Sequence, residues 1–315
     1  MCYSVMVETD LKKLEKQFSA KADIKSFERI YKERSENIPN IQIPVALDHN
    51  FNRDEFKNES ILQHSKSYYE NRLMELERKL FSKKKEIHDL EQKLKTKETK
   101  TNRKKLETAN RVAKKVQQQI ERFQKPSQES TQRIFQYTYA PLLTINAKSE
   151  RIIHPFRYQL RPSFKEEEVP SKINMFNART DSLEDRPSWR RLFLHRHAAL
   201  IMKGFYEWVE DPETGKSRQI RFQPGNDQLM WTPCIYDRWE SKDKTQTIDS
   251  FALLTRDPPP EVEEMGHDRC PVFPKWSHLD DWLNIKTLDQ KKAFQIFNDL
   301  EDVTYNHQWV SAASS

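Results

Sequence analysis

The second residue of the chain, Cys2, could carry unusual chemistry if the initiator Met1 were removed. A cysteine at the true N-terminus holds a free α-amine and a thiol on adjacent carbons. The amine titrates near ~8 and the thiol near ~8.5, so each has a reactive form at neutral pH. The amine could attack an aldehyde to give an imine, on which the thiol closes a five-membered thiazolidine. Alternatively, the thiol alone could act as an N-terminal nucleophile in hydrolysis.

Three stretches in the second half of the chain combine polar chemistry with turn-forming or aromatic residues. Residues 177–180 supply an amide and a guanidinium, and residues 266–271 place His267 in a loop bounded by Gly and Pro. In residues 204–208, Glu207 lies between aromatic residues at the end of an apolar run, where burial would raise its pKa toward a useful general-acid range. The competing interpretations are a strand-end glutamate facing solvent and an ordinary loop histidine.

Composition sets the broad class of the protein. The 315 residues suffice for one large domain or two ordinary ones, and a hydrophobic content of 36% with 11% aromatic residues can supply a core. No apolar run approaches the ~20 residues that span a membrane, and the first residues lack the basic and apolar regions of a signal peptide. The three scattered cysteines give neither a disulfide framework nor paired zinc ligands. We therefore predict a reduced, cytoplasmic protein with no metal or cofactor.

The positive charge of the chain is concentrated in one segment. Net charge is +6, yet residues 60–126 hold 19 basic and 9 acidic residues, a local excess of +10 that leaves −4 elsewhere. Apolar residues recur there at three- and four-residue steps over 73–94 and again over 106–123, which is a coiled-coil type of repeat. The two series are out of phase, and the stretch between them is polar, which favours a helical hairpin over one long helix. Its charge fits either a solvated surface or an arm that binds nucleic acid or a protein partner.

Secondary structure before this segment is predicted to be sparse. Residues 1–7 alternate as a short strand, and Asp10 can cap a helix with three apolar residues on one side. Residues 21–58 are predicted to be mainly loop, because two prolines interrupt them, with a possible strand at 41–45.

From residue 133 the chain changes to short β-rich segments separated by turn-forming residues. Closely spaced strands of this kind predict a mainly antiparallel sheet or barrel. Two helices are expected near the end, one after Ser277 and one over 288–300. The predicted strands are 135–145, 152–160, 198–209, 219–222, 229–236, 250–255 and 303–310.

Taken together and in this order, the motifs resemble the SOS-response-associated peptidase (SRAP) family, the abasic-site processing proteins that cross-link to single-stranded DNA. The resemblance implies an α+β fold with a mainly antiparallel β-sheet or barrel core, flanking helices and an inserted coiled-coil hairpin. It divides the chain into an SRAP domain, residues 2–58 and 127–315, and an inserted basic hairpin, residues 59–126. The motifs that carry the resemblance are Cys2, Asn-Ala-Arg at 177–179, Pro-Ser-Trp-Arg at 187–190, Gly-Phe-Tyr-Glu-Trp at 204–208 and His-Asp-Arg-Cys-Pro-Val at 267–272.

The resemblance also implies a mechanism, with four catalytic residues. Once Met1 is gone, the Cys2 amine would form a Schiff base with the ring-opened aldehyde of an abasic deoxyribose, and the thiol would close a thiazolidine. Glu207 would shuttle protons and His267 would act as a second acid or base. Asn177 would hold the N-terminus in place.

The partner that the resemblance implies is single-stranded DNA containing abasic sites, with the hairpin as a possible extra contact to DNA or to a protein. Tyr158 stands where the family has a tryptophan that stacks on a base, and the guanidinium groups would bind phosphates. Two other interpretations remain open: a cysteine peptidase with the same N-terminal nucleophile, and a scaffold that binds through the hairpin. The residues expected to bind DNA are Arg157, Tyr158, Arg161, Arg179, Arg190, Thr255 and Arg269.

Overall fold

A closed ring of five strands forms the centre of the molecule. The computed structural model describes residues 3–125 and 131–310, so the prediction for Cys2 lies outside the described residues. In the ring, β10 pairs with β5, β5 with β4, β4 with β7, and β9 joins β7 back to β10. All these pairings are antiparallel except β10 with β5. The strands are β4 (Tyr139–Ile145), β5 (Arg151–Tyr158), β7 (His197–Glu210), β9 (Met230–Glu240) and β10 (Thr247–Arg256).

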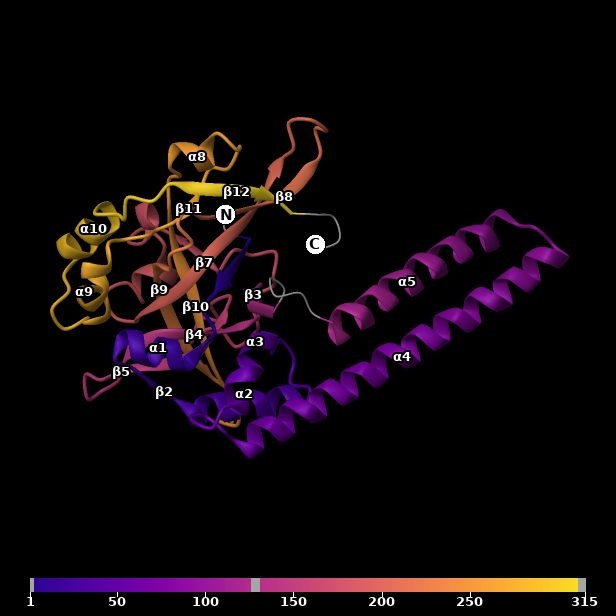
Figure 1. Ribbon diagram of the computed structural model, residues 1–315, viewed down its shortest axis with the longest axis horizontal. Coiled ribbons are helices and arrows are strands. Elements are labelled where there is room, and N and C mark those ends of the chain that lie inside the picture. The colour runs from indigo at the N-terminus through magenta and orange to yellow at the C-terminus, as the bar shows by residue number, and fades with distance from the viewer. Residues whose placement is uncertain (1–2, 126–130, 311–315) are drawn as a thin grey trace.

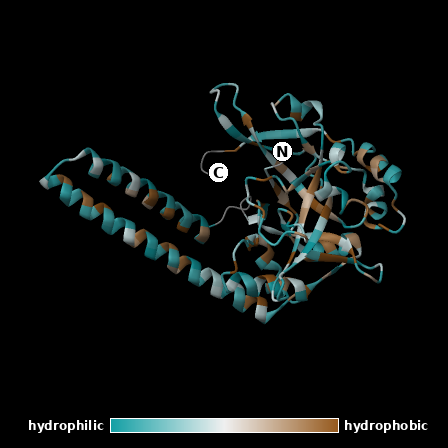
Figure 2. Ribbon diagram, turned by 180° about the vertical axis from the view of Figure 1, so that it is seen from behind, coloured by the Kyte–Doolittle hydropathy of each residue, from teal (hydrophilic) through white to brown (hydrophobic). Residues whose placement is uncertain are grey.

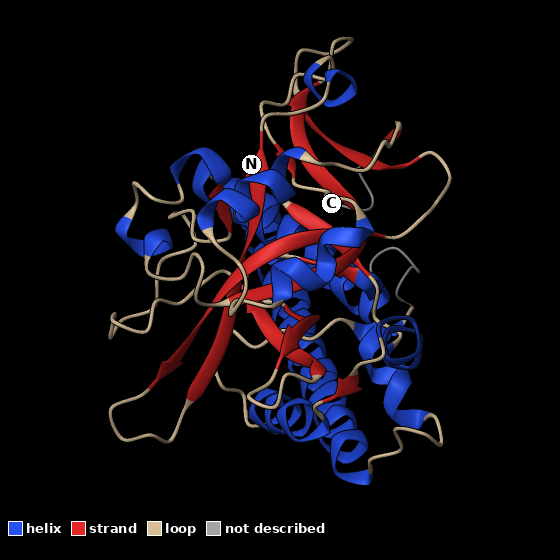
Figure 3. Ribbon diagram, turned by 90° about the vertical axis from the view of Figure 1, so that its left-hand side faces the viewer, coloured by secondary structure: helices blue, strands red, loops and turns tan. Residues whose placement is uncertain are grey.

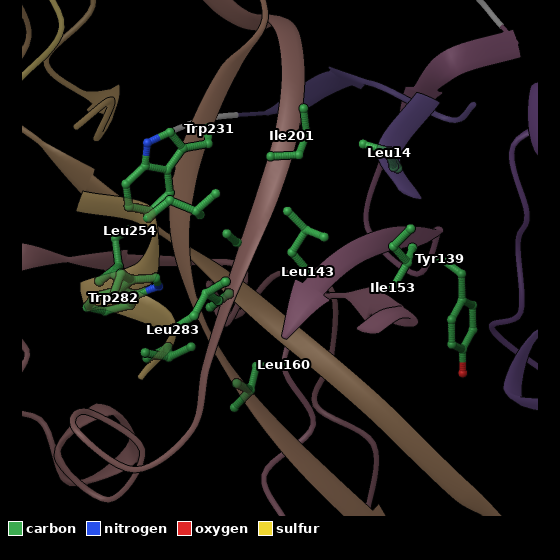
Figure 4. Close-up of a cluster of buried hydrophobic side chains, with 14 of the residues drawn as sticks. Leu14, Tyr139, Leu143, Ile153, Leu160, Ile201, Trp231, Leu254, Trp282 and Leu283 are labelled. Carbon is green, nitrogen blue, oxygen red and sulfur yellow. The ribbon is translucent and has the colours of Figure 1, made fainter. Parts of the chain in front are cut away.

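Alternating side chains of these strands build two separate apolar clusters, because successive residues of a strand point to opposite faces. On β7, Leu200 and Phe205 belong to the cluster inside the ring, whereas Ile201 belongs to the cluster outside it. The outer cluster also takes Leu14 and Trp282 from the helices that cover the barrel (Figure 4). The fold is therefore α+β, with a barrel core and flanking helices, as the sequence predicts (Figure 3).

The covering helices come from both ends of the chain. Asp10 accepts a hydrogen bond from the backbone of Lys13 and caps α1, as predicted. The prediction of mainly loop over 21–58 is wrong, because an amphipathic helix, α2, buries four residues there and residues 41–45 contribute only an isolated bridge at Gln42. The helices are α1 (Leu11–Phe18), α2 (Ile24–Ser35), α3 (Val45–Asp48), η1 (His49–Asn52), η3 (Trp276–His278), α9 (Leu279–Leu283) and α10 (Gln290–Asn298).

Short strands extend the ring on one side and bring the start of the chain into the sheet. β1 lies between β7 and β3 and is antiparallel to both, and β8 continues the sheet from β7 to β12. The short elements are β1 (Ser4–Val7), β2 (Lys21–Ala22), β3 (Arg133–Ile134), β6 (Asn177–Arg179), η2 (Thr180–Ser182), α7 (Pro187–Arg190), β8 (Ser217–Pro224), α8 (Pro260–Glu263), β11 (Cys270–Pro271) and β12 (Tyr305–Trp309).

Two long helices project from this body as an antiparallel pair (Figures 1 and 2). They are α4 (Glu59–Thr96) and α5 (Lys100–Gln124), and they stand where the sequence predicts a hairpin. Asn58 and Thr99 cap them through their side-chain oxygens, which satisfies backbone N–H groups of the first turns. No helix within the described ranges is both long and apolar enough to cross a membrane.

A buried ionic cluster ties β5 to β10 away from the predicted site. The His154 ring lies 3.0 Å from the Asp23 carboxylate through Nδ1 and 2.9 Å from Asp249 through Nε2. Burial alone would lower the pKa of His154, but its hydrogen bonds to the two carboxylates raise it above its ordinary value. The same contact lowers the pKa of Asp23 to about 2. Because Arg238 also pairs with Asp249 at 2.7 Å, the cluster balances its own charge and serves to join the strands.

Candidate active site

The sequence-predicted acid and base, Glu207 and His267, lie in contact. Oε2 of Glu207 is 3.1 Å from Nε2 of His267. Glu207 is 0% exposed and sits on β7 between Phe205 and Val209, which point into the barrel cluster. Two motifs far apart in the chain therefore meet at one end of the barrel.

Two glycines allow this meeting. A Cβ on Gly204 would lie 2.6 Å from the backbone oxygen of Phe222, so only glycine lets β8 approach β7 this closely. Gly266, directly before His267, has a φ of +84°, a left-handed conformation that glycine adopts without strain. The glycines of both motifs thus serve the placement of the residues that follow them.

The two ring nitrogens of His267 face different partners, Nε2 the Glu207 carboxyl group and Nδ1 the backbone of Arg269. Nδ1 of His267 lies 2.8 Å from the backbone oxygen of Arg269, which can only accept, and 3.3 Å from the backbone nitrogen of the same residue, which can only donate. The shorter contact favours a proton on Nδ1, and we assign it there. Nε2 then faces the carboxyl group either as an acceptor from the protonated acid or as a donor to the carboxylate. Burial raises the pKa of Glu207 above its ordinary value, and the contact with His267 opposes this shift. A buried carboxyl with a raised pKa is suited to general acid–base work.

The carboxyl group of Glu207 has few other partners. Within the described residues, neither of its oxygens has a hydrogen bond of good geometry. The backbone N–H of Tyr3 is also close to it, but this group donates to the backbone oxygen of Tyr206 at 3.1 Å. Buried polar atoms are rarely left in this state, and where they are, function is a common reason.

Asn177 is held in place by the tyrosine that was expected to stack on a base. The Tyr158 hydroxyl donates to Oδ1 of Asn177 at 3.1 Å, and the Asn177 backbone N–H donates to Oδ1 of Asn174 at 3.0 Å. Tyr158 is 0% exposed and stacks on Phe251 inside the barrel. The prediction that Tyr158 contacts a base is therefore not supported, because its ring does not reach solvent. Its observed contact orients the Asn177 amide.

Arg157 and Arg161 are likewise buried and occupied. Both guanidinium groups bind the Glu168 carboxylate, Arg157 at 2.8 Å and Arg161 at 3.0 Å. Arg161 also stacks over the ring of Trp239, with 3.7 Å to its centroid. The prediction that these arginines bind DNA is not supported, because Glu168 already pairs with both of them inside the protein.

Three other predicted contacts lie at the edge where β6, β10 and β11 meet. Arg179 is exposed and binds Asp181, whose carboxylate also accepts from Arg269 at 3.1 Å. Arg269 lies next to Asp257 as well, at 2.6 Å. Thr255 is buried, and its hydroxyl donates to the backbone oxygen of Ala178, so it positions β6 and does not face solvent. Arg179 and Arg269 thus form a basic pair that acidic residues hold in place.

Arg190 is the predicted phosphate contact that the structure does not bring to this edge. Arg190 is exposed at the end of α7. Within residues 3–125 and 131–310, its side chain makes no hydrogen bond or ion pair with Glu207 or His267. α7 is anchored instead by Trp189, which is buried in the outer apolar cluster.

An exposed aromatic cluster that no sequence motif predicts lies beside the start of the chain. The Tyr3 ring makes edge contacts with Phe135 at 5.8 Å and Trp208 at 5.9 Å between ring centroids. All three are large apolar side chains that face solvent, with exposures of 42% for Tyr3, 37% for Phe135 and 42% for Trp208. Only Trp208 lies in a motif, and no local signal joins it to the other two residues, which come from separate segments.

Below this cluster, Arg133 holds the start of the chain to the sheet. Its guanidinium lies 3.6 Å from the Tyr206 ring centroid, and it donates to the Ser4 hydroxyl at 2.7 Å and 2.9 Å. These contacts add to the pairing of Ser4 with Tyr206 in the sheet. In the described part of the chain, no group of three His, Cys, Asp or Glu side chains is arranged to hold a metal ion.

The sequence matches a family model described as SOS response associated peptidase (SRAP) over residues 80–313. This covers well over half of the chain, which therefore belongs to the SRAP family. The match takes in Asn177, Glu207 and His267 and does not extend to Cys2.

Several relatives carry the name abasic site processing protein. YoqW of Bacillus subtilis (strain 168) is 30% identical over 159 residues, which are 49% of this chain and 68% of YoqW. HMCES of Pongo abelii is 24% identical over 185 residues, 50% of this chain and 52% of HMCES. A solved structure from Bacteroides thetaiotaomicron aligns with a TM-score of 0.47 and 18% identity, over 55% of this chain and 74% of that one.

Replacing Glu207 by glutamine should make the stability of the protein less sensitive to pH. Because the folded-state pKa of this carboxyl is raised, its contribution is present below the unfolded value near ~4.3 and is lost as pH rises toward the folded value. Denaturant unfolding of wild type and Glu207→Gln from acid to neutral pH should therefore show the variant gaining relative stability as pH rises. The exposed Glu210→Gln, on the same strand, is the control and should follow wild type. Parallel curves for wild type and Glu207→Gln would show that burial does not raise this pKa.

Proposed function

We propose that this protein processes abasic sites in single-stranded DNA by forming a covalent cross-link through Cys2. The observation that carries the proposal is the attachment of Tyr3, the residue that follows Cys2, to the strand that bears Glu207. Tyr3 donates its backbone N–H to Tyr206, and Ser4 pairs with Tyr206 in the sheet. A chain that begins at Cys2 would thus start beside a buried proton carrier.

The proposed reaction needs Met1 to be removed first, because the α-amine does not exist until then. The Cys2 nitrogen attacks the aldehyde carbon of the ring-opened abasic deoxyribose, and loss of one water leaves an imine. The thiol sulfur then adds to the imine carbon, and the nitrogen takes up the proton that the thiol gives up. The product is a thiazolidine, in which both the nitrogen and the sulfur of Cys2 are bonded to the same sugar carbon.

Opening the sugar and forming the imine both require protons to move, and the Glu207–His267 pair supplies a carrier. In its acid form Glu207 can protonate the ring oxygen as the sugar opens, and as a carboxylate it can accept a proton from the attacking amine. His267, at 3.1 Å, can donate a proton to Glu207 or accept one from it. Asn177, oriented by Tyr158, is the proposed holder of the N-terminus.

The exposed aromatic cluster supports a single-stranded partner. Bases without a pairing partner stack on aromatic side chains, whereas a duplex keeps its bases covered. Such a surface, next to the start of the chain, is formed by Tyr3, Phe135 and Trp208. Unpaired bases are proposed to stack on these rings and not on Tyr158. The proposed phosphate contacts are the exposed Arg179 at the edge of the sheet and the exposed Arg190 at the end of α7, whereas Arg269 is buried and paired with Asp181 and Asp257 and serves to hold that edge.

A second function, hydrolysis, is favoured by the peptidase in the family description. The same thiol could release Met1 from the protein itself, with the Glu207–His267 pair as base. We propose this self-processing as a single event that prepares the N-terminus. Repeated turnover of a separate peptide would instead identify a peptidase.

Incubation with an abasic single-stranded oligonucleotide should give an adduct that survives denaturation, and Cys2→Ala should abolish it. The variant lacks the sulfur that is proposed to release Met1 and to close the ring, so any imine that its N-terminal amine forms hydrolyses when the protein is denatured. Denaturing gel electrophoresis of labelled oligonucleotide measures the yield.

The matched controls are Cys234→Ala and Cys270→Ala. Burial raises the pKa of both thiols, which makes them poor nucleophiles at neutral pH. Both variants should cross-link like wild type. An equal adduct with Cys2→Ala, or its loss in Cys270→Ala alone, would contradict the assignment of the nucleophile.

Trp208→Ala should weaken binding of undamaged single-stranded DNA by about 1–3 kcal/mol, the value of one stacked base. This is a loss of roughly 5- to 150-fold in affinity. Fluorescence anisotropy with a labelled oligonucleotide measures it. Phe164→Ala removes another exposed aromatic ring, which contacts Arg191 and not the cluster, and should bind like wild type. Equal affinities for the two variants would rule out the aromatic cluster as the base-stacking surface.

A further inference from the structure

The positive charge of the hairpin belongs mainly to one of its two helices. Residues 59–96, which form α4, hold nine basic and seven acidic residues, whereas residues 100–125 hold nine basic and only two acidic residues. On α4, three basic side chains pair with acidic neighbours one turn away, as Lys66 does with Glu70 and Lys83 with Glu86. The charge of α4 is thus largely balanced within the helix, and that of α5 is not.

The basic residues of α5 gather on the side that faces away from α4. Four of them, Lys100, Lys104, Arg111 and Lys115, follow one another at steps of four, seven and four residues, which places them within about 60° of each other around a helix of 3.6 residues per turn. They lie opposite the buried seam formed by Ala109, Ala113 and Val116. We call these four residues the α5 stripe.

The α5 stripe is exposed and makes no ion pair in the described residues, although Lys100 and Lys104 line a surface hollow together with Glu86 of α4, which pairs with Lys83. All four side chains are exposed, and none makes an ion pair within residues 3–125 and 131–310. Glu107 is the one acidic residue of α5 on the same side, and Glu121 accepts a hydrogen bond from Gln117. Lys114, also exposed, adds a further positive charge at the edge of the stripe.

The root of the hairpin is fixed to the body, so the stripe has a defined direction. Arg34 of α2 is buried beneath α4, with its guanidinium 4.5 Å from the Tyr68 ring centroid and 3.3 Å from the Ser65 hydroxyl. The Tyr69 hydroxyl donates to Asp48 at 2.5 Å. α5 lies on the side of α4 nearer β3 and β8, the strands beside β1 and β7 (Figure 1). In the chain, α5 is followed by β3, which pairs with β1, so the arm joins the body beside the strand that follows Tyr3.

The chemistry of the stripe fits duplex DNA better than a single strand. Its only functional groups are cations, and the one aromatic residue of α5, Phe123, packs on Tyr69 at 5.0 Å in the seam. Without aromatic side chains on which bases could stack, the cations of the stripe can bind only the phosphate backbone. The stripe runs for about 22 Å along a straight helix, a length over which duplex DNA presents about 13 negative charges.

We propose that the α5 stripe binds the phosphate backbone of duplex DNA that adjoins the single-stranded segment. The proposal rests on the proposed function for the single strand and extends it. The aromatic cluster takes the unpaired bases, and the arm holds the neighbouring duplex. The preferred substrate is then a junction between single-stranded and double-stranded DNA.

The test replaces the four stripe residues by glutamine, a neutral residue with good helix propensity, as K100Q/K104Q/R111Q/K115Q. The matched control, K79Q/K84Q/K85Q/K95Q, removes the same charge from exposed positions of α4. Anisotropy with undamaged oligonucleotides compares a junction, its single-stranded overhang alone and its blunt duplex, from about 50 to about 200 mM salt. Circular dichroism verifies that both variants keep their helices.

Wild type and the α4 control should bind the junction at least tenfold more tightly than the overhang. The stripe variant should lose this advantage. Its slope of log affinity against log salt should be shallower by about 3 to 4, because each phosphate that is no longer neutralised reduces the slope by about 0.9. Junction binding unchanged in the stripe variant, an equal loss in the α4 control, or no junction preference in wild type would each overturn the proposal.

These outcomes are separate from those of the proposed function. Adduct yield with a short abasic single strand should be the same in the stripe variant and wild type. A wild-type protein that forms no adduct would defeat the cross-linking proposal, whereas the junction and duplex measurements contain no abasic site and stand on their own.

Discussion

The pairing of β1 with β7 is the constraint on which the rest of the site depends. A chain start is normally free to fray, because few contacts hold it. Here the first described residues are held from two sides, by the sheet bond from Tyr3 to Tyr206 and by Arg133, which lies over Tyr206 and binds Ser4. Neighbouring residues of a strand point to opposite faces. Because Tyr206 of β7 faces the start of the chain, the next residue of β7, Glu207, faces the interior of the barrel.

Burial of Glu207 carries a cost that the barrel must offset. A carboxyl group with no exposure and with poor hydrogen bonding would normally be replaced by an apolar residue. Its presence beside His267 is understandable if the raised pKa is what the protein uses. The two apolar clusters, one inside the ring and one beneath the helices, supply the rigidity that holds such a group in place. Figure 4 shows residues of the second cluster.

The barrel and the placement of Glu207 near His267 follow from local patterns that are visible in the sequence. Alternating apolar residues predict the strands, and the glycines before Glu207 and His267 mark the close approach and the turn that position them. The prediction of loop over 21–58 was wrong because it relied on composition. The prolines of that stretch lie outside α2, and the helix hides its buried face behind polar and charged residues.

Exposure is what the sequence does not predict. Tyr158 has the right aromatic character for base stacking but points into the barrel, and Arg157 is neutralised by Glu168, a partner that only the fold brings to it. Conversely, Tyr3 and Phe135 become a surface only because β1 and β3 lie side by side. The unequal charge of α4 and α5 likewise cannot be recognised from the sequence alone. It becomes apparent only when the ends of the two helices and their buried residues are known.

The most direct test of the central claim is the intact mass of the protein before and after exposure to abasic single-stranded DNA. The account predicts a protein that lacks Met1 and that, after exposure, gains the mass of one oligonucleotide less one water, with the gain confined to the N-terminal peptide after proteolysis. Capture of DNA by a protein that retains Met1, or capture at any other peptide, would contradict it.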